Sequence, residues 1–262
     1  MEHFESIRIA RDGDVMVVTI DRDGDDLNRV DGVLHDDLHR LFPRLQEERD
    51  ARAVVLTAAG RAFSAGGDFG WFPELQEPGR LELLRLDAKQ LIWALLDVHL
   101  PIVCALEGPA VGLGASIALL CDAVFMAESA TIVDPHVRVA IVAGDGGTVA
   151  WPAAMGPMRA KRYLLTGDAV TATEAERLGL ITEVVPDGQA DDAALAFARR
   201  LAAGAPLAVQ YTKQAVNQAL KQALATSFDL ATALEIVTFQ SADHGEALRA
   251  LREKRPPRFE GR

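Results

Sequence analysis

Two glycine-rich segments stand out as places where the backbone itself could do chemistry. One runs from Phe63 to Asp68 (FSAGGD) and the other from Glu107 to Gly114 (EGPAVGLG). Glycine has no Cβ, so the backbone at these positions can come close to a ligand. Backbone N–H groups that converge on one point can stabilise an oxygen that becomes negatively charged during a reaction. The two segments are therefore candidates for a paired oxyanion site.

Both glycine-rich segments follow a short apolar run. The runs 53–57 (AVVLT) and 102–106 (IVCAL) are uninterrupted, short and rich in β-branched residues, which predicts buried strands. The chain is apolar and helical from Ala115 onward, and Asp68 is a suitable N-cap for a helix after the first segment. We therefore expect strand, glycine loop and helix start to occur twice, which would aim backbone N–H groups into open space.

The rest of the pattern predicts an α/β chain whose strands come first and whose helices come last. A hairpin is expected around the turn at 11–14, because apolar runs at 7–9 and 15–20 flank an Asp-Gly pair. Apolar residues at helical spacing predict helices over 33–49 and 81–98. The segment 69–79 is expected to be irregular and mobile. Further short strands are expected at 123–127 and 181–185, and helices from residue 191 to the end with a break near 204–206.

At this point the chain resembles a known family. The motifs GRAFSAGGD (60–68) and PAVGLGASIALLCD (109–122) are similar to the two oxyanion-hole motifs of the crotonase family (enoyl-CoA hydratase/isomerase), and the tail EKRPPRFEGR (253–262) is similar to that family's tail. The resemblance covers about residues 5 to 262. It implies a crotonase-like spiral of repeated ββα turns over residues 1–190. It also implies a helical region over 191–262 that serves trimerisation and active-site closure, in a homotrimer or hexamer.

The resemblance also implies an acyl-CoA thioester ligand, with coenzyme A as part of the substrate and no separate cofactor. By their places in the motifs, the N–H groups of Gly67 and Leu113 would bind the thioester oxyanion. The path of the pantetheine and adenine would be lined largely by backbone atoms of Arg61, Ala62, Phe63, Ala65 and Gly66. Candidates for the CoA phosphates are Arg61, Lys213, Lys254 and Arg255, each with a solvated surface charge as the alternative.

The sequence departs from the family where the hydratases carry two glutamates that hold one water. Those positions fall at Ser116 and His136, and neither is acidic. Asp145 lies close to where the dienoyl-CoA isomerase branch has a catalytic acid, and a His–Asp pair resembles the β-diketone hydrolase branch. A carboxylate would fix the tautomer of His136 and raise its basicity, so that the imidazole takes a proton from water or substrate. Ser116 would hydrogen-bond the substrate or a water, and Asp134 stays open as an alternative acid partner.

Three functions remain possible on these residues. The leading one is hydration of an enoyl-CoA double bond, with water or proton handled by His136 and Asp145. The second is carbon–carbon bond hydrolysis of a β-dicarbonyl or cyclic keto substrate by the same pair. The third is a non-catalytic acyl-CoA binding protein. The sequence does not separate hydratase, hydrolase and isomerase.

Composition narrows the class of partner. The 262 residues carry a formal charge of 27 − 38 = −11 with no basic block, which argues against nucleic acid. The two cysteines lie in apolar runs, which is typical of buried reduced thiols and of a reducing compartment. No Cys/His cluster has zinc spacing, so no metal is expected. The first residues lack an apolar signal segment and no apolar run is long enough to span a bilayer, so a cytoplasmic protein is expected.

Overall fold

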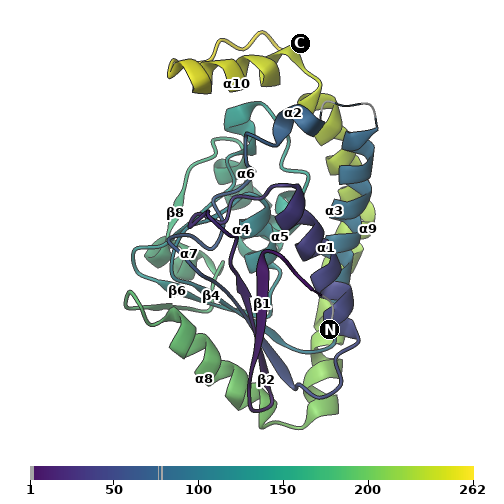
Figure 1. Cartoon of the computed structure of the whole chain (residues 1–262), viewed down its shortest axis with the longest axis vertical. Helices are drawn as coiled ribbons and strands as arrows, with labels where there is room; N and C mark the ends of the chain where they lie inside the picture. Colours follow the sequence, from purple (N-terminus) through teal and green to yellow (C-terminus); the bar gives the residue numbers. More distant parts are fainter. Residues whose placement is uncertain (1–2, 76, 78) are drawn as a thin grey trace.

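The computed structural model describes residues 3–75, 77 and 79–262. Its main sheet has the strand order β1-β2-β3-β4-β6-β9, in which β1 and β2 form an antiparallel hairpin and the later neighbours pair in parallel (Figure 1). A second, small sheet has the order β5-β7-β8. The strands are β1 (Ile7–Asp12), β2 (Val15–Ile20), β3 (Ala53–Ala58), β4 (Ile102–Leu106), β5 (Ala110–Val111), β6 (Ala123–Ala127), β7 (Thr131–Val133), β8 (Val170–Thr171) and β9 (Glu183–Val185).

Helices cover both faces of the main sheet. They are α1 (Gly32–Gln46), α2 (Phe72–Leu75), α3 (Arg80–Asp97), α4 (Leu113–Leu119), the 3-10 turn η1 (His136–Val139), α5 (Gly147–Met155), α6 (Pro157–Leu164), α7 (Ala172–Leu178), α8 (Ala190–Ala202), α9 (Pro206–Phe239) and α10 (Ala242–Glu253). The central strands β4 and β6 are buried along their whole length, as parallel strands covered on both sides are. The layered α/β architecture confirms the fold class expected from the sequence.

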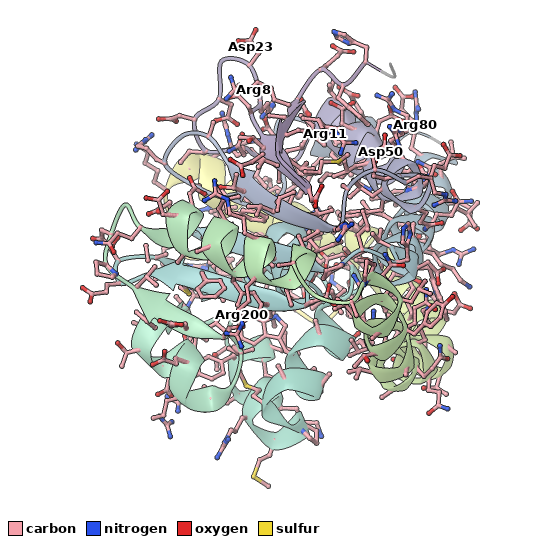
Figure 2. The ribbon with its side chains drawn as sticks, turned by 90° about the horizontal axis from the view of Figure 1, so that it is seen from below. Arg8, Arg11, Asp23, Asp50, Arg80 and Arg200 are labelled. Atoms are coloured by element: carbon pink, nitrogen blue, oxygen red, sulfur yellow. The ribbon has the colours of Figure 1, made fainter. Side chains whose placement is uncertain are left out.

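One face of the sheet is covered by α8 alone, which Figure 2 shows lying across the strands. Its buried positions recur every four residues and are all alanine: Ala190, Ala194, Ala198 and Ala202. Small side chains in one row let the helix come close to the sheet. The sequence assigned α8 to a C-terminal region beginning at residue 191, but this helix belongs to the core around the sheet.

The first glycine loop differs from the expectation that a helix starts at Asp68. Gly67 forms an isolated β-bridge with Val30, and the N–H of Asp68 donates to the Val30 carbonyl at 2.8 Å. The carboxylate of Asp68 accepts from the Gly70 N–H and pairs with Arg22 at 3.1 Å. The loop is therefore held as extended chain, and the next helix, α2, begins only at Phe72. Residues 76 and 78 of the segment expected to be irregular lie outside the described residues, and its expected mobility stays a prediction.

The last two helices, α9 and α10, follow one another at the end of the chain. Helix α9 runs beside α3, and α10 lies across the top in Figure 1. The imidazole of His244 on α10 contacts the Val139 carbonyl of η1 at 2.7 Å and packs between Phe72 and Phe239. Within the residues that the structure describes, no helix is long and apolar enough to cross a membrane. The expected trimer or hexamer stays a prediction.

Candidate active site

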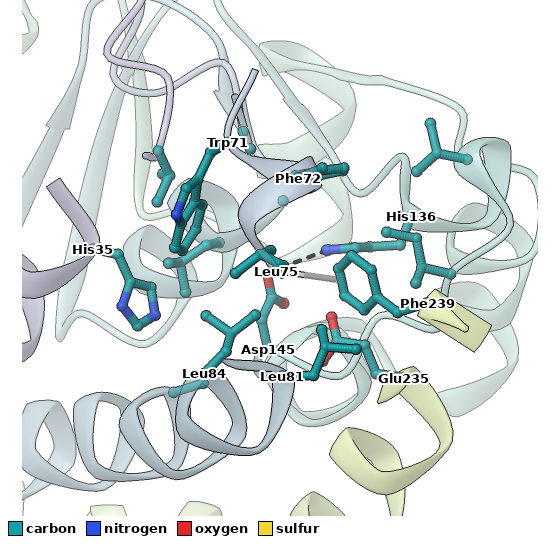
Figure 3. Close-up of a pocket in the computed structure, with 18 of the residues that line it drawn as sticks. His35, Trp71, Phe72, Leu75, Leu81, Leu84, His136, Asp145, Glu235 and Phe239 are labelled. Carbon is teal, nitrogen blue, oxygen red and sulfur yellow. Dashed lines mark ion pairs between the residues drawn. The ribbon is translucent and has the colours of Figure 1, made fainter. Parts of the chain in front are cut away.

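A cavity of about 160 Å³ opens where the two glycine loops meet α1, α2, α3, η1 and α9 (Figure 3). Most of its wall is apolar, and its charged or titratable side chains are His35, Arg85, His136, Asp145 and Glu235. An engineered cavity of about 150 Å³ in another protein holds benzene. The cavity therefore suits an apolar or weakly polar group with about six heavy atoms.

The two glycine loops approach closely at Gly66 and Gly112, which carry no side chains. Gly66 has a φ of +81°, and a Cβ there would lie 3.1 Å from the Val111 side chain. Gly112 has a φ of +57°, and a Cβ there would lie 3.9 Å from the Cα of Gly66 and 3.5 Å from the His136 ring. Positive φ favours glycine at both positions. The absence of side chains thus brings the second loop against both the first loop and His136.

The amides of Gly67 and Leu113 both belong to the cavity wall. Val30 bonds to Gly66 and Asp68 at 2.8 Å each, so the intervening Gly67 amide points away from Val30. Leu113 is the first residue of α4, where an N–H has no partner within its own helix. In the described residues neither amide has an acceptor. Two residues with unpaired amides therefore line one cavity, and their role as an oxyanion site stays a prediction.

His136 lies between two carboxylates. It opens η1 directly after Pro135, and its Nδ1 lies 2.6 Å from Oδ1 of Asp134, which follows β7. Its Nε2 faces Oδ2 of Asp145 at 3.5 Å, the pair joined by a dashed line in Figure 3. The structure thus brings together the two residues paired from the sequence. Asp134, left open from the sequence, is the closer partner, and its short contact fixes which ring nitrogen faces the cavity.

Ser116 lies behind Asp145 and outside the cavity wall. The serine is fully buried, and its hydroxyl donates to Oδ1 of Asp145 at 3.0 Å. The sequence placed Ser116 against substrate or water, but its contact in the structure is with the carboxylate. It therefore holds one oxygen of Asp145 while the other faces His136.

Glu235 is a cavity residue that sequence reasoning missed. It comes from α9, and its carboxylate lies against Gly144, just before Asp145, where a Cβ would run into it. Figure 3 has Glu235 and His136 on the same side of the cavity. No motif surrounds Glu235 in the sequence, since it is one acidic residue on a helix of 34 residues. Its role depends on how α9 packs over the site.

Comparison with known proteins gives the family. The family model described as enoyl-CoA hydratase/isomerase matches residues 10–262. This chain belongs to the enoyl-CoA hydratase/isomerase family. It is 35% identical over 260 residues to a probable enoyl-CoA hydratase of Rhodobacter capsulatus, covering 99% of each chain. The solved enoyl-CoA hydratase/isomerase of Mycobacterium paratuberculosis is 39% identical, with a TM-score of 0.89 over 94% of this chain and 98% of that one.

A solved structure with a different activity is also similar. It is a β-diketone hydrolase from the cyanobacterium Anabaena, bound to (S)-3-oxocyclohexyl acetic acid. It is 30% identical to this chain and has a TM-score of 0.84, covering 90% of this chain and 94% of that one. Family membership therefore supports an enoyl-CoA hydratase/isomerase type of enzyme, and more than one reaction is found among such relatives.

In this family member the ionisable groups of the cavity shift one another's pKa. Burial lowers the pKa of His136, but the charges of Asp134 and Asp145 outweigh burial and raise it well above its usual value. Burial raises the pKa of Asp145, with His136 acting against the shift. Burial, opposed by His136, also raises the pKa of Glu235 to about 8. At neutral pH the group therefore holds an imidazolium and a protonated Glu235, and its members share protons as one unit.

The CoA contacts expected from the family's motifs divide into two groups. Ala65 and Gly66 line the cavity, whereas Ala62 and Phe63 are buried behind the loop. Lys213 is away from the cavity: its ammonium pairs with Asp122 at 2.7 Å and donates to the Leu100 carbonyl at 2.8 Å. Leu100 precedes the first residue of β4, whereas the second glycine loop follows the last residue of that strand, so the two lie at opposite ends of β4. Lys213 is therefore held by these partners in the structure, and its contact with CoA phosphates stays a prediction.

The other expected phosphate ligands are surface residues. Arg61 pairs with Asp26 at 2.5 Å and its side chain is 72% exposed. Lys254 caps the C-terminus of α10 with a φ of +52°, and Arg255 pairs with Glu246 at 2.5 Å. None of these cations lines the cavity, so any contact with CoA phosphates would lie outside it. Their roles stay predictions.

Asp134, His136 and Asp145 also form a set of potential metal ligands. One donor atom from each lies within 4.8 Å of the others. However, Nδ1 of His136 and Oδ1 of Asp134 are already paired with each other at 2.6 Å. The set is therefore better matched to an imidazole held between carboxylates. The expectation that the enzyme needs no metal stays a prediction.

Proposed function

We propose that this enzyme adds water to the carbon–carbon double bond of an enoyl-CoA thioester. The observation that carries the proposal is that the two unpaired amides of Gly67 and Leu113 share one cavity with the His136–Asp145 pair. The amides would bind the thioester oxygen, which gains charge as water attacks the β carbon. One such donor is worth roughly 3 kcal/mol of transition-state stabilisation.

The water would be held between His136 and Asp145. Their facing atoms are 3.5 Å apart, too far for a strong direct hydrogen bond, so a water beside them can contact both. As its oxygen bonds to the β carbon, one water proton passes to the Asp145 carboxylate, because the imidazolium of His136 can only donate a hydrogen bond. The electrons of the double bond move onto the thioester oxygen. Asp134 keeps the imidazole oriented through Nδ1, and Ser116 keeps Asp145 oriented through Oδ1.

Glu235 would complete the reaction by giving a proton to the α carbon. Its raised pKa, about 8, keeps the carboxyl protonated at neutral pH, as a general acid requires. When the enolate collapses, the α carbon takes this proton. The proton left on Asp145 then returns to Glu235 through water. In this way one acid and one base, in place of two glutamates at the family's usual positions, would handle the water.

A second function, hydrolysis of a carbon–carbon bond, is favoured by the orientation of His136 between two carboxylates and by the likeness to the β-diketone hydrolase. Here water attacks one carbonyl of a β-dicarbonyl compound, and Asp145 accepts its proton while His136 holds the water. The bond between that carbonyl and the carbon between the two ketones breaks, releasing an enolate. The two amides would hold the enolate oxygen, and Glu235 would protonate its carbon.

A mass-spectrometric assay separates these functions. Purified protein is incubated with enoyl-CoA thioesters, with β-keto and cyclic diketo-CoA thioesters, and with the free cyclic diketones. Gain of one water with the carbon skeleton intact supports hydration, and gain of water with fragmentation typical of an opened skeleton supports hydrolysis. The same panel with His136→Asn is the control. Tight CoA thioester binding with no mass change in any substrate would contradict both reactions and favour a binding protein.

A further inference from the structure

The wall opposite the charged cluster contains a second histidine, His35. It lies on α1, which starts after Asp31 caps the Leu34 N–H at 2.9 Å, directly beyond the bridge between Val30 and the first glycine loop. His35 is 6% exposed, lines the cavity and packs against Trp71 with ring centroids 5.8 Å apart. Figure 3 has it across the cavity from His136 and Glu235. The start of α1 therefore places the imidazole of His35 in the wall of the cavity that the first glycine loop also lines.

The ring nitrogens of His35 have no hydrogen-bond partner among the described residues, although they are not sealed off from the cavity. His39, one turn further along α1, is different: its Nε2 lies 2.6 Å from the Gln90 side chain. Because the ring nitrogens of His35 are not fully buried, water can satisfy them in the free protein, and a polar ligand group can replace that water. A ligand in the cavity can supply the missing partner.

The imidazole of His35 is uncharged at neutral pH. Burial lowers its pKa to about 4, helped by His39 and opposed by the charges of Asp87 and Asp36. Arg85, the cation that shares the cavity wall, is held by Glu82 through contacts of 2.9 and 2.6 Å. A neutral imidazole offers one donor and one acceptor. It therefore matches a carbonyl or hydroxyl oxygen rather than an anion.

We propose that His35 selects substrates whose acyl group carries an uncharged oxygen, a carbonyl or hydroxyl, away from the thioester. This rests on the proposed function, because it assumes that the thioester oxygen lies at Gly67 and Leu113. Near His35 the cavity wall is largely apolar, with Trp71 and Leu84 on the same side of the cavity in Figure 3, so a polar group there would discriminate between acyl groups. A carboxylate is disfavoured because Asp134 and Asp145 already make the opposite wall acidic.

The test measures binding by calorimetry of two saturated thioesters, hexanoyl-CoA and 5-oxohexanoyl-CoA, neither of which has a double bond to hydrate. Wild type is expected to bind the oxo compound about tenfold more tightly, as for one hydrogen bond to a buried group. His35→Leu is expected to bind both equally, at the level of hexanoyl-CoA. His35→Gln, which keeps a donor and an acceptor, is expected to restore part of the preference. His39→Leu makes the same change on the same helix outside the cavity and is expected to behave as wild type.

The outcomes separate this inference from the proposed function. Equal binding of the two thioesters by wild type would overturn the role of His35 while leaving an acyl-CoA site intact. A preference that survives His35→Leu in a protein with unchanged thermal unfolding would overturn it too. Tighter binding of adipoyl-CoA than of 5-oxohexanoyl-CoA would replace the uncharged oxygen with a carboxylate. Failure of every thioester to bind would overturn the proposed function and, with it, the inference.

Discussion

The cavity has two walls that hold the same residue type in opposite states. His136 lies between Asp134 at 2.6 Å and Asp145 at 3.5 Å, and its pKa is raised well above the usual value. His35 packs beside Trp71 without a carboxylate in contact, and its pKa falls to about 4. Burial acts in the same direction on both rings. Carboxylates within contact distance, rather than burial, therefore decide whether a histidine in this cavity is charged or neutral at pH 7.

Among the variants that test this difference between the two histidines, replacement of the charged His136 should have the largest effect on activity. We expect His136→Asn to lower kcat by about 10³-fold, within the range for loss of a general acid–base group. Binding of a saturated acyl-CoA should change little, because the donors at Gly67 and Leu113 are backbone amides. Steady-state kinetics and calorimetry measure the two effects. Turnover within tenfold of wild type in a folded variant would show that His136 does not hold the attacking water.

The two carboxylates beside His136 should not be equivalent. We expect Asp145→Asn to lower kcat by about 10²-fold, since Asp145 faces the cavity, and Asp134→Asn to lower it less, since Asn can still accept from Nδ1. Both changes remove a negative charge, so both should lower the pKa of His136 toward its usual value. NMR titration of the His136 ring measures that pKa. An unchanged titration in either variant would contradict the charged state assigned to this wall.

Much of this fold could be predicted from local patterns. The hairpin, the buried strands at 53–57 and 102–106 and the helical end were expected from the sequence and are present as β1–β2, β3, β4 and α8–α10. Strand β8 was missed because two residues give no period, and the helix start at Asp68 was wrong because Val30, far along the chain, pairs with the loop. Local sequence patterns therefore predict most helices and strands. How a glycine loop ends depends on pairing between segments that are distant in the sequence.

The candidate site divides in the same way. The residues of the glycine loops and the pair His136 and Asp145 lie on motifs or near them, so the resemblance could find them. Glu235 and His35 could not be found, because each is one polar residue on an amphipathic helix and gains its meaning from the packing of α9 or α1 over the cavity. The ion pair of Lys213 with Asp122 could not be predicted either, because it depends on which carboxylate the fold brings near.

The raised pKa of Glu235 predicts how kcat depends on pH. Because its pKa is about 8, the proposed proton donor is lost as pH rises, and kcat should fall above about pH 8. Glu235→Gln keeps the shape and has no proton to give, so we expect it to lower kcat by about 10²-fold at pH 7 and to remove the decline above pH 8. A pH profile of kcat for both proteins measures this. A decline that persists in the variant would assign it to another group.

Stability gives an independent check on the same residue. A glutamate with a pKa of about 8 when folded and 4.5 when unfolded binds more protons in the folded state between those values. The free energy of unfolding that it contributes therefore falls as pH rises from 4.5 to 8. Relative to wild type, Glu235→Gln should gain thermal stability over this range, with the largest gain above pH 8. Thermal unfolding at pH 5 and pH 9 measures the gain, and parallel curves would contradict the raised pKa.

The smallest expected effect comes from Ser116, which touches the charged wall only from behind. Ser116→Ala leaves Oδ1 of Asp145 without its 3.0 Å donor, and that hydrogen bond favours the charged carboxylate. The pKa of Asp145 should therefore rise further, which moves the acidic limb of the kcat profile to higher pH. We expect a loss in kcat of about tenfold, the scale of one buried hydrogen bond, with binding of acyl-CoA unchanged. If binding weakened and the limb stayed in place, Ser116 would contact the substrate, as the sequence suggested, rather than position Asp145.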